Sequence, residues 1–347
     1  MSPEFKNIAD LIESPDKNNI RLGLLLAVGY EEEFQEYFKC SVADYQELLS
    51  FLVKLDIWRG DSDVTKITRI YANSKRLLSI PSAIGLLKEL EFINVAKNRI
   101  SKIPFGLFLS RKLKHVYLQA NYIQEIPIGI ENATKLEELY LARNQIENLP
   151  KEIGNLKKLK FLGLEANLLK HINFPIENLR KLEKLELSYN QLQTLPAGLY
   201  FLFKLKQLSL RFNQIAEIAP EMENLKELTS LGLSGNLLTH IPVQIGSLQN
   251  LKTLELDKNQ LSQIPDEIGN LENLEILNLD SNQLKEFPQC ILKLKNLKSL
   301  FLSHNQIGVV PKELAELPHL EYLNISGCPI QAVPKELEKE KLILIRK

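Results

Sequence analysis

Asparagine and leucine recur along most of the chain at one fixed spacing. Asparagine stands at every 23rd position from residue 98 to residue 305, without an insertion or a deletion. In residues 136–150 the apolar positions Leu139 and Leu141 alternate with polar ones, and Ile146 and Leu149 follow. A period of two predicts a short strand with one buried face, and the later apolar positions predict a coil that turns around the interior. The repetition predicts a stack of like units, with strands about 4.8 Å apart.

The asparagine position predicts a ladder of buried amides. The chain leaves the strand there, and an amide can satisfy buried backbone groups in its own loop and across to the next unit. Cys328 occupies the following position of the series and can replace the amide in part as a weak donor, whereas Lys75, in the preceding position, cannot be buried cheaply. The predicted ladder comprises Asn98, Asn121, Asn144, Asn167, Asn190, Asn213, Asn236, Asn259, Asn282, Asn305 and Cys328.

Proline follows the ladder position by six residues in ten of the twelve units. Its fixed φ and missing N–H suit a turn toward the side opposite the strands. The segments that come next, such as Ile153–Leu156, are too short for long helices.

The unit resembles the leucine-rich repeat family, in the 23-residue class with the consensus LxxLxLxxNxLxxLPxxIGxL. The match covers about four-fifths of the chain, from about residue 66 to 341. This class is common in intracellular Ras-binding repeat proteins and in bacterial repeat proteins. The resemblance implies an α/β solenoid, a horseshoe whose concave parallel sheet has about 12 strands, and a tendency to bind proteins.

Two regions are expected, a helical N-terminal cap at residues 1–62 and a solenoid with a C-terminal cap at residues 63–347. Ser2 before Pro3, and Ser41 three residues before Asp44, are typical of helix starts, and three or four short helices are predicted. Residues 1–60 hold 11 acidic and 6 basic residues. This region is either an acidic cap for the end of the array or a separate interaction module that uses Glu31, Glu32, Glu33 and Glu36.

The composition excludes several classes of protein. With 43 basic and 43 acidic residues, the chain lacks the basic excess of a nucleic-acid binder. Three cysteines cannot form a disulfide framework, which favours a reducing compartment. Neither a signal peptide nor an apolar run of about 20 residues occurs, so no membrane insertion is expected. We expect a cytoplasmic monomer, with export in the absence of a recognisable signal as the alternative.

Catalytic and metal-binding patterns are missing from the sequence. None of the motifs GxxxxGK[ST], GxGxxG, HExxH and GxSxG occurs, and no histidine has a partner at a metal-ligand spacing. Cys40 has no neighbouring base and is interpreted as structural. We therefore expect no catalytic residue, no bound metal and no cofactor.

Positions six, four and two residues before the ladder are predicted to face away from the core. Aromatic residues occupy them in consecutive units, and aromatic residues and arginine are favoured interface anchors. Alternatively, these rings only pack against one another or under the cap. The candidate partner-binding residues on the concave face are Arg69, Tyr71, Phe92, His115, Tyr117, Tyr140, Arg143, Phe161, Lys184, Tyr189, Arg211 and Phe212.

Two charge patterns accompany this face. Seven residues before the ladder, glutamate and lysine alternate between units, as in Glu91 and Lys114, which predicts ion pairs between neighbouring units. Glu255, Asp257 and Asp280 form a possible acidic patch, which is either a hard-cation site or a solvated stripe.

Together these patterns predict a non-enzymatic module that binds a protein or peptide on its concave face. One alternative is a bacterial surface or host-interaction factor exported without a signal. The other is a regulator of an enzyme that acts through the N-terminal helices.

Overall fold

The computed structural model describes residues 1–14, 16–38, 40–58, 64–338 and 342–346. The chain divides into two compact units, Met1–Leu159 (unit 1) and Lys160–Lys347 (unit 2). The predicted boundary between the cap and the repeats, at residues 62 and 63, lies outside the described residues. It therefore stays a prediction.

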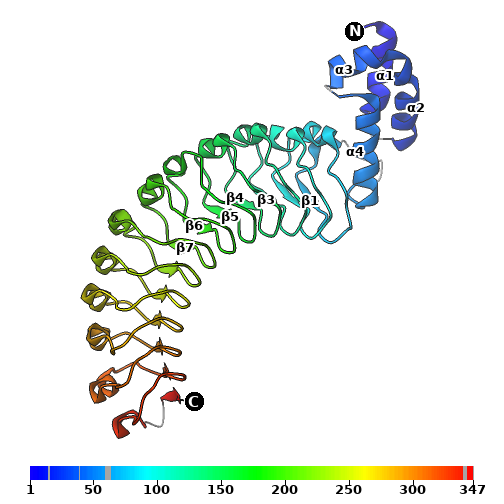
Figure 1. Cartoon of the computed structure of the whole chain (residues 1–347). Helices are drawn as coiled ribbons and strands as arrows, with labels where there is room; N and C mark the ends of the chain where they lie inside the picture. Colours follow the sequence, from blue (N-terminus) through cyan, green and yellow to red (C-terminus); the bar gives the residue numbers. More distant parts are fainter. Residues whose placement is uncertain (15, 39, 59–63, 339–341, 347) are drawn as a thin grey trace. The chain divides into compact units, whose positions relative to one another are not determined.

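Unit 1 begins with four α-helices (Figure 1). The Ser2 hydroxyl accepts a hydrogen bond from the Phe5 N–H, and the Ser41 hydroxyl accepts one from the Asp44 N–H, so both predicted helix starts are confirmed. One face of α2 packs on α1, where a Cβ on Gly23 would lie 2.7 Å from Ile12. The helices are α1 (Pro3–Ile12), α2 (Lys17–Ala27), α3 (Glu31–Phe38) and α4 (Val42–Lys54), with the 3₁₀ turn η1 (Val28–Tyr30) before α3.

Helix α4 joins these helices to the first repeat. Tyr45, Leu48 and Leu52 are buried on it. The Asp44 carboxylate accepts hydrogen bonds from the hydroxyls of Ser41 and Ser82, each at 2.7 Å, and Ser82 begins the first 3₁₀ helix of the repeats. Within unit 1, α4 therefore packs directly against the end of the repeat array, as a cap requires.

Replacing Asp44 with alanine should lower the stability of unit 1 by about 1.5 kcal/mol at pH 7, because two hydroxyl donors lose a charged acceptor. The bonds from Ser41 and Ser82 hold the pKa of Asp44 below its usual value. A depressed folded pKa contributes stability above the unfolded pKa, and that contribution is lost as the pH falls through the folded value. Urea unfolding at pH 7 and pH 3 should show a difference between wild type and variant that is smaller at pH 3 than at pH 7. Glu47→Ala, on an exposed residue of the same helix, is the control.

Every repeat contributes one three-residue strand whose middle residue faces the core. In β4, for example, Leu139 is buried between the half-buried Glu138 and Tyr140. In each unit the strands follow sequence order, and neighbouring strands pair in parallel and in register. Unit 1 holds β1 (Arg69–Tyr71), β2 (Phe92–Asn94), β3 (His115–Tyr117) and β4 (Glu138–Tyr140).

Unit 2 continues the series with nine strands among its described residues. The last of them, β13, pairs with β12 from the C-terminal segment and makes thirteen strands where about twelve were expected. The strands are β5 (Phe161–Gly163), β6 (Lys184–Glu186), β7 (Gln207–Ser209), β8 (Ser230–Gly232), β9 (Thr253–Glu255), β10 (Ile276–Asn278), β11 (Ser299–Phe301), β12 (Tyr322–Asn324) and β13 (Ile343–Ile345).

Short 3₁₀ helices form the side opposite the strands. Proline stands before most of them in an extended conformation, so the predicted role of proline is confirmed. In unit 2 the strands line the inner side of the curve that its repeats follow, and the 3₁₀ helices line the outer side (Figure 1). After η2 (Val64–Lys66) they are η3 (Ser82–Leu86), η4 (Phe105–Leu109), η5 (Ile128–Asn132), η6 (Lys151–Asn155), η7 (Ile176–Asn178), η8 (Ala197–Phe201), η9 (Pro220–Asn224), η10 (Val243–Ser247), η11 (Asp266–Asn270), η12 (Gln289–Lys293), η13 (Lys312–Glu316) and η14 (Lys335–Leu337).

The asparagine ladder is confirmed, with one correction. The Asn190 Nδ2 donates to the carbonyl oxygens of Leu187 in its own loop and Leu164 in the preceding repeat, both at 3.0 Å. Its Oδ1 accepts from the Leu169 N–H at 3.0 Å, also in the preceding repeat. The Asn190 side chain thus crosses to the preceding repeat, not to the next one, because the Leu164 carbonyl and the Leu169 N–H of the preceding repeat face it.

The two ends of the ladder behave as their residue types predict. Cys328 Sγ donates to the Leu302 carbonyl at 3.2 Å, which reproduces one of the asparagine contacts. Lys75 is exposed, and its backbone N–H donates to the Asn98 Oδ1 of the next repeat.

Candidate partner-binding surface

The face of the sheet that carries the first and third residue of each strand is called the strand face here. In-register pairing places equivalent residues of successive strands side by side, so each position forms a column across the repeats. On this face of unit 1, four aromatic side chains from β1 to β4 form a continuous row, the aromatic strip: Tyr71, Phe92, Tyr117 and Tyr140.

The rings of the aromatic strip contact one another in sequence. Centroids are 4.8 Å apart for Tyr71 and Phe92, 5.3 Å for Phe92 and Tyr117, and 4.4 Å for Tyr117 and Tyr140. The last pair is nearly parallel, at 11°. Tyr71 is 52% exposed, and the other three rings are half-buried. The strip therefore holds its rings in fixed positions and still presents them to solvent.

Polar side chains frame the aromatic strip. The Tyr117 hydroxyl donates to Glu138 at 2.7 Å, and the His115 Nδ1 lies 3.2 Å from the same carboxylate. Burial raises the pKa of Tyr117 above its usual range, and the hydrogen bond to Glu138 raises that pKa further. At the other end the Arg69 guanidinium lies 6.0 Å from the Phe92 centroid and donates to the Tyr71 hydroxyl at 3.3 Å. Hydrogen bonds and ring contacts thus orient every aromatic side chain of the strip.

The strand face of unit 2 is mixed, and a cluster of charged side chains lies over β6 to β9. Lys184 Nζ lies 5.5 Å from the Phe161 centroid and 2.9 Å from Glu186. The Arg211 guanidinium pairs with Glu255 two repeats further on. This reach passes over Gly232, where a Cβ would lie 2.8 Å from the Arg211 Nε.

The alternating charges beside the strands form the predicted ion pairs. Lys114 lies 3.0 Å from Glu91, and Lys206 lies 2.8 Å from Glu183. Glu275 is paired on both sides, with Lys252 at 3.5 Å and Lys298 at 2.6 Å. All of these groups are solvent-exposed or half-buried, so water and salt screen the pairs and each contributes little to stability.

Three of the twelve candidate residues lie outside the strand face. Arg143, Tyr189 and Phe212 stand immediately before ladder asparagines, in the loop that follows each strand, with φ of 56°, 56° and 53°. The sequence interpretation placed them on the concave sheet because it did not account for the left-handed backbone at this position. The structure thus brings together Arg69, Tyr71, Phe92, His115, Tyr117 and Tyr140, and separately Tyr189 and Phe212.

The acidic patch does not form a shared cation site. Glu255 is held by Arg211, while Asp257 accepts from Ser234 at 2.5 Å and from Asn278 at 3.0 Å. Asp280 accepts from the Ser303 N–H, and its burial raises its pKa. Across the described residues, no group of three or more His, Cys, Asp or Glu side chains is arranged to hold a metal ion.

The cysteines lack the environment of nucleophiles. Burial raises the pKa of Cys40 to about 12, and the nearby carboxylates of Asp44 and Glu31 add to the shift. Burial likewise raises the pKa of Cys290 to about 11. At neutral pH both side chains are therefore thiols, which attack electrophiles poorly.

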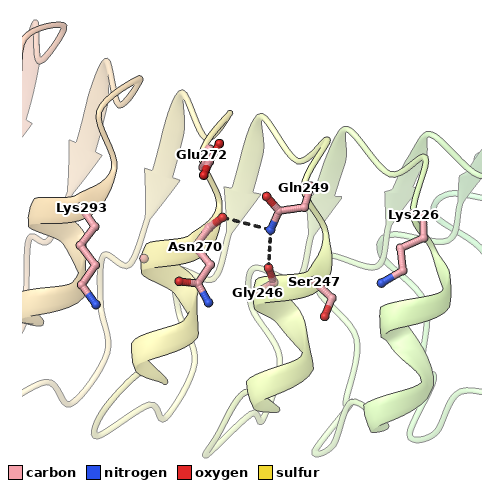
Figure 2. Close-up of a pocket in the computed structure, with 8 residues that line it drawn as sticks. Lys226, Gly246, Ser247, Gln249, Asn270, Glu272 and Lys293 are labelled. Carbon is pink, nitrogen blue, oxygen red and sulfur yellow. Dashed lines mark hydrogen bonds between the residues drawn. The ribbon is translucent and has the colours of Figure 1, made fainter.

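A shallow pocket lies on the 3₁₀ side of unit 2, lined by charged and amide side chains (Figure 2). The Gln249 side chain donates to the carbonyl oxygens of Gly246 at 2.7 Å and Asn270 at 3.0 Å, which ties η10 to η11. Lys226, Glu272 and Lys293 stand around it. The Gln249 side chain thus serves the packing of successive repeats.

Comparison with known proteins agrees with this geometry. Residues 111–169 match a family model described as leucine rich repeat, and residues 236–339 match one described as leucine-rich repeat region. The solved structure of a leucine-rich repeat protein from Leptospira interrogans is 35% identical with a TM-score of 0.73, over 81% of this chain and 78% of that one. The chain belongs to the leucine-rich repeat family.

Other leucine-rich repeat structures show the same fold. An internalin (InlF) from Listeria monocytogenes is 27% identical with a TM-score of 0.69, over 87% of this chain and 94% of that one. The plant peptide hormone receptor RGFR1, solved in complex with RGF2, is 34% identical with a TM-score of 0.66, over 72% of this chain and 42% of that one. A comparison with curated proteins found no match. Among the described residues no helix has the length and apolar character needed to cross a membrane.

Sequence reasoning missed three residues that shape this surface. Gly232 and Gly235 leave room for Arg211 and Phe212, and the Lys258 ammonium, two repeats beyond Phe212, lies over the Phe212 ring. Reading the repeats by column, one residue before the ladder, would have shown alanine and glycine on either side of two aromatic residues.

Proposed function

We propose that this leucine-rich repeat protein is a non-enzymatic module that binds a protein or peptide through the aromatic strip of unit 1. The observation that carries the proposal is the contact row of Tyr71, Phe92, Tyr117 and Tyr140 on the strand face of unit 1, whose other residues are polar. A solvated strand face requires no large rings. Such rings are, however, preferred anchors of interfaces.

The polar frame supports the same proposal. Because Glu138 holds Tyr117 and the Arg69 guanidinium donates to the Tyr71 hydroxyl, the rings lose little conformational freedom when a partner arrives. Four successive strands set four rings side by side over roughly 15 Å, at about 4.8 Å per strand. A strip of that length suits an extended peptide segment or one edge of a folded partner.

The test replaces Tyr117 and Tyr140 together with alanine and compares the variant with the intact protein in affinity capture from the source cells. The captured protein is then titrated against both forms. We expect the partner affinity to fall at least 10-fold, because hot-spot aromatic side chains each contribute about 2 kcal/mol or more. The melting curve should stay nearly unchanged, because both rings lie on the surface.

A matched control is Phe301→Ala with Tyr322→Ala. These rings form a comparable pair on β11 and β12 of unit 2, with centroids 4.8 Å apart. Equal affinity of the Tyr117–Tyr140 variant and the intact protein, or an equal loss in the control variant, would contradict a site on the aromatic strip.

A further inference from the structure

A pocket of about 400 Å³ lies in unit 1 beside the C-terminal ends of η4 and η5, and three successive repeats contribute to it. We call it the Arg111 pocket. It is lined by Lys88, Leu109, Arg111, Lys112 and Asn132. Three of these side chains are cationic, and none of the described lining residues is acidic. The pocket therefore concentrates positive charge at a place that the aromatic strip does not include.

The positive charge of the pocket is only partly balanced. The Lys112 ammonium pairs with the Glu89 carboxylate. Within the part of the chain that the structure describes, no hydrogen bond or ion pair engages the side chain of Lys88 or of Arg111. Partial burial lowers the pKa of Lys88 and thus disfavours its charged form, and no carboxylate offsets this cost. Two positive charges consequently line the pocket without a counter-charge.

The packing of the repeats does not account for these two cations. Lys88 and Arg111 stand thirteen residues after the ladder position of their repeats. At the same position two repeats after Arg111, the Lys157 ammonium donates to the Gly154 carbonyl at 2.7 Å and closes the last turn of its 3₁₀ helix. Lys295 makes the same kind of bond in unit 2, at 3.2 Å. Because Lys88 and Arg111 do not make it, their charged groups are available to a ligand.

Hydrogen bonds fix the backbone that carries the cations. Ser110, which is 2% exposed, donates its hydroxyl hydrogen to the Lys88 carbonyl at 2.9 Å. This bond ties Lys88 of one repeat to the residue before Arg111 in the next. The Asn132 Nδ2 donates to the Gly129 carbonyl at 2.9 Å and retains a second N–H. The walls of the pocket are thus set in advance, and binding has to order only two long side chains.

We infer that the Arg111 pocket binds a phosphoryl group through Arg111 and Lys88. A phosphate monoester carries a charge of about −1.5 to −2 at pH 7, which matches the two unbalanced cations. The guanidinium fork suits a pair of phosphate oxygens, the ammonium adds a point charge, and the remaining Asn132 N–H is a neutral donor. The inference goes beyond the proposed function and does not rest on it, because no residue of the pocket belongs to the aromatic strip.

Inorganic phosphate is the probe, titrated into the ¹⁵N-labelled full chain at pH 7.5 and constant ionic strength. The Nε–H resonance of Arg111 and the side-chain amide resonance of Asn132 should shift and saturate at millimolar phosphate, because both groups then donate to phosphate oxygens. Acetate should bind at least five-fold more weakly, since it carries a single charge on two oxygens. Shifts that do not saturate, or equal binding of acetate, would overturn the inference.

Single substitutions separate the pocket from the general surface charge. Followed at the Asn132 amide, Lys88→Met and Arg111→Met should each weaken phosphate binding at least five-fold. Arg111→Lys, which keeps the charge and loses the fork, should weaken it less. Arg99→Met is the matched control, since Arg99 is an exposed arginine of unit 1 outside the pocket. Unchanged binding in Arg111→Met, or an equal loss in Arg99→Met, would mean that phosphate meets only diffuse charge, and the pocket would be wrong.

A small phosphate ester and a phosphorylated side chain present the same group, and two further probes distinguish them. Tighter binding of N-acetyl-glycyl-phosphoseryl-glycinamide than of inorganic phosphate assigns the site to a phosphorylated polypeptide. Tighter binding of glycerol 2-phosphate alone assigns it to a small ester. The variant that lacks Tyr117 and Tyr140 should bind phosphate as the intact protein does, so loss of the polypeptide partner and loss of phosphate binding are separate outcomes.

Discussion

Replacement of Asn213 with alanine is expected to lower the free energy of unfolding by about 3–5 kcal/mol. The Nδ2 donates to the carbonyl oxygens of Leu210 and Leu187, both at 3.0 Å, and the Oδ1 accepts from the Leu192 N–H at 3.0 Å. Asn213 is 7% exposed, so water cannot replace the amide without opening the loop. Each buried group left without a partner costs about 1–3 kcal/mol.

Denaturant unfolding followed by circular dichroism measures this loss, and hydrogen exchange locates it. Exchange should accelerate first at the Leu192 amide and in the two repeats that Asn213 joins, because each repeat of a solenoid contacts mainly its neighbours. Gln214→Ala is the control, on an exposed side chain of the same loop. A loss below about 1 kcal/mol in Asn213→Ala would show that the ladder amide is not needed at this position.

The regular part of the fold could be predicted because every repeat poses the same physical problem. A buried leucine between two outward residues defines the strand, and a buried amide after it satisfies the loop, so Leu139 and Asn144 are readable from spacing alone. The crossing of the amide to the preceding repeat could not be read, since spacing does not say on which side an unpaired backbone group points. The extra strand β13 could be predicted, because the apolar, β-branched run Ile343–Ile345 favours a last strand at the C-terminal end.

The residues of the candidate surface could be predicted from equivalent positions of the repeats, but the contacts between their side chains could not. Comparison of equivalent positions across the repeats identified the members of the aromatic strip. It could not show that Tyr117 stacks on Tyr140 or that the Tyr117 hydroxyl donates a hydrogen bond to Glu138. It failed most where a small residue decides the geometry. Gly232 lets Arg211 reach Glu255, and Gly235 makes room for the Phe212 ring, two effects that depend on a side chain that is absent.

Small residues also control the side opposite the strands, and Gly246→Ala should destabilise unit 2 by about 1–2 kcal/mol. In an open helical position the same exchange would stabilise by about 0.5–1 kcal/mol, because alanine has less backbone entropy to lose. Here the new Cβ would overlap the Glu267 carbonyl oxygen and lie 2.8 Å from the Glu267 Cβ. Overpacking of this kind costs about 1–3 kcal/mol, so the clash reverses the sign of the substitution.

The clash would also separate η10 from η11, and with them the two carbonyl groups that Gln249 bridges (Figure 2). Gly246→Ala should therefore lower the midpoint of urea unfolding. When Gln249→Ala, which removes the bridge, is added to Gly246→Ala, it should lower that midpoint almost no further. Gly308→Ala is the matched control, since a Cβ there would meet nothing within 4 Å. It should leave stability unchanged or raise it by about 0.5 kcal/mol. Equal effects of the two alanines would mean that the 3₁₀ helices can move apart freely, and close packing of this side would then not contribute to the stability of the array.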